Sequence, residues 1–253
     1  MTITDVDKVA NVLLYEGYLL YPYRPSALKN RQPFTFGIIA PGDSMQTECL
    51  VMGDTATTFD VRVRFIELTP DPVEREVTTS AMGGTPFAWP SLSGVVEVST
   101  LRYADRTLRL RVRIVNTTPE SGHSMAATHT ILGVANGEFV SMIDPPEIYR
   151  ATAGECQNIR TWPVLAGPRG QHQIMLSSPI IVYDYPEIAD ESPGDLYDST
   201  EIDEILSLRI LTLSDDEQRE IRASDERGRA LLERTQSLAA EQLMKLHGTM
   251  RPV

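Results

Sequence analysis

Alternation of hydrophobic and polar residues dominates the chain up to about residue 186. In the predicted strand 58–68, the apolar residues Phe59, Val61, Val63 and Phe65 alternate with polar ones, which is the pattern of a strand with one buried and one solvated face. Residues 107–115 repeat it, with arginines at the polar positions. The other predicted strands are 34–40, 48–52, 94–101, 130–134, 138–142, 162–165 and 173–185. We therefore expect about nine to eleven short strands.

Turn signals between these segments predict hairpins. Residues 103–106 join 94–101 to 107–115, and Asn136-Gly137 separates two apolar runs, as in a type I′ turn. No amphipathic helix pattern interrupts the strands, so parallel crossovers are not expected. The sequence predicts a mainly β fold for residues 1–186, an antiparallel sandwich or open barrel. Residues 9–21 are apolar and fit either a helix or a strand.

The composition changes near residue 186. Residues 184–226 hold fifteen Asp and Glu against three Arg, so we expect an acidic linker and a helical tail over 187–253. Residues 201–213 begin like a helix and end like a strand. Ser214 and Glu217 form a capping box for a helix that should run to Gln236. A last helix over 239–247 should end at Gly248.

Charge narrows the classes of partner. The formal net charge is −12, which disfavours nucleic acid and anionic membranes. Residues 1–7 are acidic, unlike a signal peptide, and the apolar run 12–23 is shorter than the roughly 20 residues of a membrane span. Two cysteines do not make a disulfide framework. We expect a cytoplasmic protein.

Recognisable catalytic and metal motifs are missing from the sequence. We predict no cofactor and no enzyme activity, although a cluster of Cys49, Cys156 and a histidine stays open. The alternative is a β-sandwich enzyme acting on a small molecule or sugar, for which Glu97, Asp60 or His129 would have to share a pocket with a raised carboxylate pKa.

Basic residues gather in two places on this acidic chain. Arginines fill the polar positions of two predicted strands, and a loop over 22–31 is locally basic. If the two strands are neighbours, their guanidinium groups crowd one face, and the acidic tail of the same or another subunit would cover them. The predicted partner-binding residues are Tyr15, Tyr18, Tyr23, Arg24, Lys29, Arg31, Arg109, Arg111 and Arg113. A self-assembling homo-oligomer is a further alternative.

Segments at both ends carry a resemblance. They are 13–30 (LLYEGYLLYPYRPSALKN), 192–206 around SPGDLYD and TEIDEIL, and 241–248 (EQLMKLHG). Together they resemble an uncharacterised bacterial family associated with uptake [NiFe] hydrogenase gene clusters. The chain lacks the paired Cys-x-x-Cys motifs that hold nickel in a hydrogenase large subunit. The resemblance therefore implies a non-catalytic accessory, assembly or scaffold protein whose partner is a hydrogenase subunit or maturation intermediate.

Overall fold

The computed structural model describes residues 3–16, 30, 34–103, 106–188, 194 and 203–246. The chain divides into two compact units. The first contains Met1–Leu14 and Phe36–Pro186, and the second contains Tyr15–Thr35 and Glu187–Val253.

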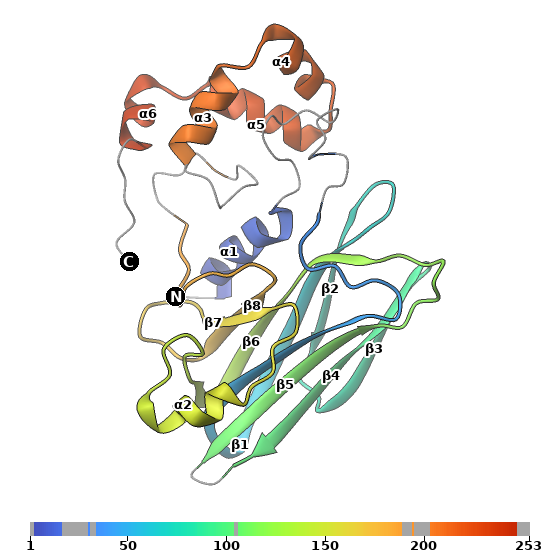
Figure 1. Cartoon of the computed structure of the whole chain (residues 1–253), viewed down its shortest axis with the longest axis vertical. Helices are drawn as coiled ribbons and strands as arrows, with labels where there is room; N and C mark the ends of the chain where they lie inside the picture. Colours follow the sequence, from blue (N-terminus) through green and yellow to red (C-terminus); the bar gives the residue numbers. More distant parts are fainter. Residues whose placement is uncertain are drawn as a thin grey trace. The chain divides into compact units, whose positions relative to one another are not determined.

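An eight-stranded antiparallel sheet makes up most of the first unit, in the order β3-β4-β5-β1-β6-β8-β7 with β2 added to β1 (Figure 1). Its strands are β1 (Ser44–Glu67), β2 (Val73–Thr79), β3 (Gly83–Trp89), β4 (Leu92–Arg102), β5 (Thr107–Asn116), β6 (Met125–Phe139), β7 (Trp162–Leu165) and β8 (Ile174–Ser178). The two ends of this order do not pair, so the sheet stays open. The predicted mainly β fold with C-terminal helices is confirmed.

β1 organises the sheet because it is long enough to serve two sets of partners. Residues Ser44–Met52 pair with β5, Val61–Glu67 pair with β2, and β6 runs along the opposite edge. Alternate residues of β1, β4, β5 and β6 face one continuous apolar core that includes Val63, Phe65 and Leu110. Burial of each such side chain stabilises the fold by about 1.5–3 kcal/mol. We call this the inner face of the sheet, and the opposite one the outer face.

The predicted hairpin at Asn136-Gly137 is wrong. β6 continues through both residues, and Asn136 adopts a φ of 55° inside an irregularity between β1 and β6. Opposite it, the β1 register shifts between Gly53 and Thr58, where the Thr57 hydroxyl donates to the Asn136 carbonyl at 2.8 Å. Asn-Gly supplies a positive φ in either setting, so the dipeptide alone does not distinguish a bulge from a turn.

Three other strand predictions need correction. Residues 48–52 and 58–67 belong to the single strand β1, because the register shift between Gly53 and Thr58 does not end the strand. Residues 34–40 form no strand, and only Ile39 makes an isolated bridge, with Met125. Residues 173–185 shorten to β8, since the chain leaves the sheet at Pro179. The hairpin between β4 and β5 is confirmed.

The segment that fitted a helix or a strand is helical as far as the structure describes it. Helix α1 spans Ile3–Tyr15 and buries Val6, Ala10 and Leu13, which lie on one face by their i, i+4, i+7 spacing. These side chains pack on the outer face of the sheet, on a cluster that includes Ile131 and Leu176. A second, unpredicted helix, α2 (Glu147–Gly154), follows β6.

Four helices form the described part of the C-terminal tail: α3 (Asp203–Leu211), α4 (Asp215–Arg222), α5 (Glu226–Gln236) and α6 (Ala240–Leu246). The capping box of Ser214 and Glu217 is confirmed. The single helix predicted from it breaks after Arg222, because Asp225 caps a new helix by accepting from the Gly228 amide at 2.8 Å. Gly248 lies outside the described residues. None of the described helices combines the length and apolarity that a bilayer crossing needs.

Candidate functional site

The arginines of β5 lie on the outer face of β4 and β5, which we call the arginine face. Arg111 and Arg113 are 47% and 43% exposed, and Glu97 of β4 lies beside Arg113 at 3.3 Å. Neighbouring positions on this face are small or half-buried, among them Ser93, Val95 and Ser99. The inward residues of the same strands fill the core, so alternation turns the arginines outward.

One buried carboxylate anchors this face. Glu48 of β1 is fully buried. Its carboxylate accepts hydrogen bonds from Arg111 Nε at 2.5 Å and from the backbone amide of Gln157 at 2.8 Å. Arg109 Nη1 lies 3.7 Å from the same carboxylate. Its guanidinium also stacks over Tyr103, 5.7 Å from the ring centroid. Arg109 is therefore committed to internal contacts, while Arg111 and Arg113 keep accessible donors.

The expected crowding of five arginines on one face does not occur. Arg62 and Arg64 lie in the half of β1 that pairs with β2 and β6, away from the half that pairs with β5. Arg62 pairs with Asp7 of α1, and Arg64 lies within 4 Å of Glu74 and Glu76 of β2. Carboxylates within the first unit thus pair with these two arginines, the role that we expected for the acidic tail.

The predicted N-terminal contact residues fall in the second unit or outside the description. Tyr15 has its ring 6.3 Å from that of Phe34 and 4.1 Å from the guanidinium of Arg227, so it packs within the second unit. Tyr18, Tyr23, Arg24, Lys29 and Arg31 lie outside the described residues.

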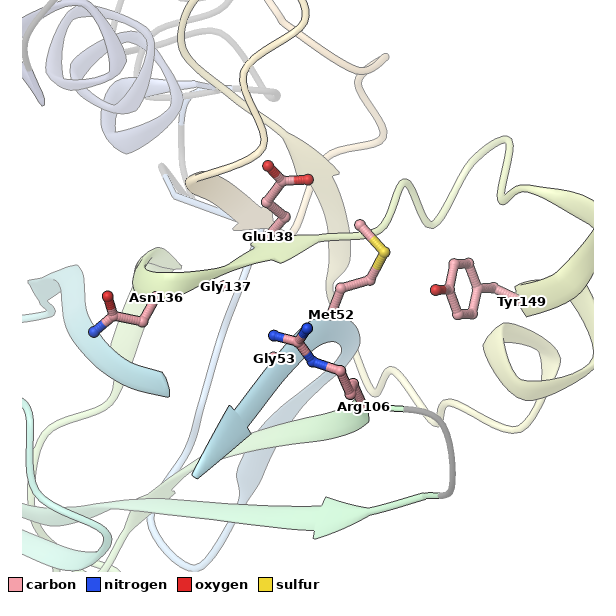
Figure 2. A pocket seen from close by; sticks show the side chains of 7 residues that line it. All are labelled: Met52, Gly53, Arg106, Asn136, Gly137, Glu138 and Tyr149. Carbon is pink, nitrogen blue, oxygen red and sulfur yellow. The ribbon is translucent and has the colours of Figure 1, made fainter. Parts of the chain in front are cut away.

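A hollow of about 420 Å³ opens where the β1–β6 bulge meets α2 (Figure 2). It is lined by Met52, Gly53, Arg106, Asn136, Gly137, Glu138 and Tyr149. Arg106 has a φ of 62° and pairs with Asp54 at 3.2 Å, and Tyr149 reaches the rim from α2. Arg106 and Asn136 thus both keep left-handed backbones at one site, as is common near functional bulges.

The two cysteines belong to different clusters of buried side chains, although Cys156 is near enough to contribute to the raised pKa of Cys49. Cys49 lies on the inner face in the main core, whereas Cys156 packs in a separate cluster with Leu50 and Ala153. Burial raises the pKa of both thiols, to about 11 for Cys156, where the charge of Glu48 adds to it. Protonated thiols are poor ligands and nucleophiles. Among the described residues, no group of three His, Cys, Asp or Glu side chains has the geometry to hold a metal.

The three residues considered for an enzyme site also lie apart. Glu97 is on the arginine face, and Asp60 lines a hollow in whose lining neither Glu97 nor His129 takes part. His129 is fully buried, and burial lowers its pKa to about 4. Its Nδ1 donates to the Ala127 carbonyl at 2.8 Å, while Nε2 has no partner in the described part of the chain.

A second glutamate, Glu67, lies at the far end of β1. The sequence placed it on the same strand as Asp60, but its burial was not predicted. Its carboxylate accepts from Arg75 Nε and from His123 Nδ1, each at 2.7 Å. Burial alone would raise the pKa of Glu67, but these hydrogen bonds and charges outweigh it and lower the pKa. Arg75 also stacks on Trp89 at 4.8 Å. Both glutamates had a detectable signal, because each adjoins apolar residues, Glu48 in Glu-Cys-Leu-Val-Met and Glu67 in Phe-Ile-Glu-Leu.

No protein-family model matches the chain, and no curated protein matches it. Among solved structures, the structure of the Clostridium perfringens CspB protease shows a partial likeness with 11% sequence identity and a TM-score of 0.18. The match covers 38% of this chain and 22% of that chain. A likeness at this level carries no argument about fold or function.

Proposed function

We propose that this protein is a non-catalytic accessory protein that binds another protein on its arginine face. The observation that carries the proposal is the exposure of Arg111 and Arg113 on a sheet face with small neighbours. Arginine is enriched in protein interfaces because its planar guanidinium donates several hydrogen bonds and stacks on apolar groups. The rigid sheet holds both side chains in place before a partner arrives.

The partner should present carboxylates. An exposed pair such as Arg113–Glu97 contributes about 0–1 kcal/mol, so a partner carboxylate can displace Glu97 at low cost. Arg111 keeps its bond to the buried Glu48 and offers its remaining donors. The resemblance to a family associated with hydrogenase gene clusters suggests a hydrogenase subunit or a maturation intermediate as this partner.

A charge reversal at one position tests the proposal. The Arg113→Glu variant should lose a partner that co-purifies with the wild type from the native host at low salt. Arg150→Glu is the matched control, because Arg150 also forms an exposed pair, with Glu147, but lies on α2. Both variants break one surface pair and change the net charge equally.

Mass spectrometry of the recovered complexes gives the readout. We expect one protein to be retained by the wild type and Arg150→Glu, lost with Arg113→Glu, and released from the wild type as salt is raised. Recovery of the same protein with all three forms, or of none with the wild type, would contradict the proposal. If the lost protein is a second copy of this chain, light scattering will show a salt-sensitive homo-oligomer, and binding of another protein is refuted.

A further inference from the structure

A second hollow lies on the outer face of the sheet, away from the arginine face, where the C-terminal half of β1 meets β2, β6 and β8. It measures about 520 Å³. Its lining consists of Asp60, Arg62, Thr78, Thr79, Ser80, Ile131, Leu132, Gly133, Val134, Ala135, Gln173 and Ile174. We call it the Gly133 groove. Its volume falls in the range of about 300–1,000 Å³ that is usual for small-molecule sites.

Gly133 is the unusual residue of this groove. It lies inside β6, paired with Asp60 on one side and Ile174 on the other. Glycine in a strand interior costs roughly 0.5–1 kcal/mol relative to alanine, and its usual reasons are a left-handed backbone or a close approach of other atoms. Neither reason holds within the protein. Gly133 has no positive φ, and an added Cβ would meet Asp60 Cβ at 3.6 Å, an ordinary contact.

The missing side chain instead keeps the floor of the groove open. Gly133 and Ala135 follow Ile131 along the outer face of β6, so the floor falls away from a large side chain to two small ones. Nothing within the protein requires a glycine at this position of the strand. Such a glycine is typical of a place where a ligand approaches the backbone closely.

Charge defines what fits above this floor. Within the described residues, the carboxylate of Asp60 makes neither a hydrogen bond nor an ion pair, whereas the neighbouring Arg62 is paired with Asp7. Thr78, Ser80 and Gln173 add neutral donors and acceptors, and Ile131 and Ile174 add apolar contact. The groove therefore offers one available negative charge next to an apolar surface.

We propose that the Gly133 groove binds a small organic cation, an ammonium group on a short aliphatic or aromatic body. The ammonium group pairs with Asp60, and the body lies over Gly133 against Ile131 and Ile174. This site uses none of the residues of the arginine face, so it stands independently of the proposed function.

Nuclear magnetic resonance titration of the full chain with n-hexylamine at pH 7 tests the site. The amides of Gly133 and Ala135 and the side-chain amide of Gln173 should shift saturably. Hexanol, which has the same body without the charge, should bind at least several-fold more weakly. Asp60→Asn should weaken hexylamine binding up to about fivefold, the loss expected for one exposed charge pair of about 1 kcal/mol.

Two further variants separate the groove from general attraction to an acidic protein. Asp144→Asn makes the same charge change at an exposed residue outside the groove and should leave binding unchanged. Gly133→Val fills the floor and should abolish the saturable shifts while the rest of the spectrum stays folded. If Gly133→Val fails to fold, the comparisons of hexylamine with hexanol and of Asp60→Asn with Asp144→Asn still decide. Equal affinity for hexylamine and hexanol, an equal effect of the two Asp→Asn changes, or no saturable shift in the groove would overturn the proposal.

Discussion

The outer face of the sheet carries two regions built from similar residues with different results. On the arginine face, long charged side chains alternate along β5 and pair with the carboxylates of Glu48 and Glu97. Around the Gly133 groove, charged residues also alternate along β1, but β6 opposite them carries Gly133 and Ala135. The charge pattern is similar in both regions, and the small residues of β6 distinguish the one that forms a groove.

The difference between a buried and an exposed carboxylate on the arginine face should give the largest effect. Glu48→Ala should lower the free energy of unfolding by about 3 kcal/mol, because two arginines and the Gln157 amide lose a buried acceptor. Glu97→Ala breaks only an exposed pair and should cost under about 1 kcal/mol. Urea unfolding of both variants measures the difference, and equal losses would mean that Glu48 does not anchor the face.

Lowering the pH should reveal a second difference between the two regions in their effect on stability. β6 buries the neutral imidazole of His129, whereas the arginine face carries charged groups. The pKa of His129 is about 4 in the folded protein, against 6.5 for an unperturbed histidine. As pH falls below 6.5, the unfolded chain binds a proton that the folded chain refuses, so stability is lost until about pH 4. The loss should approach about 3 kcal/mol at 1.36 kcal/mol per pKa unit.

The His129→Gln variant isolates this contribution, since glutamine stays neutral. The difference in unfolding free energy between wild type and variant should be constant above pH 7 and should change in favour of the variant between pH 6.5 and 4.5. Glu67, whose lowered pKa makes its contribution disappear only under more acidic conditions, lies outside that window. If the unfolding free energies of the two proteins change in parallel with pH, protonation of His129 does not destabilise the folded protein.

Two glycines of β6, four residues apart, give the smallest and sharpest test. An added Cβ at Gly137 would lie 2.8 Å from the Met52 carbonyl oxygen, so Gly137→Ala should destabilise by about 1–3 kcal/mol. Gly133→Ala meets no such obstacle and should stabilise by about 0.5–1 kcal/mol. Thermal unfolding distinguishes the two signs. Destabilisation by Gly133→Ala would mean that the strand needs this glycine for its own packing.

The β-rich character, the β4–β5 hairpin and the capping box of Ser214 could all be predicted from the sequence. These follow from local rules, namely alternation with a period of two and side-chain capping within three residues. The sequence also placed Arg111 and Arg113 outward, because alternation fixes the face on which each side chain lies once its neighbours are buried.

The contacts between distant residues could not be predicted in this way. Asn136-Gly137 forms a bulge because β1 shifts register opposite it, and the two arginine sets separate because β1 is long enough to pair with different strands along its length. Glu67 meets His123, a loop residue 56 positions away in sequence, and Gly133 becomes the floor of a groove only beside Asp60 and Ile174. Such pairings depend on register between distant segments, which no local pattern of a single chain encodes.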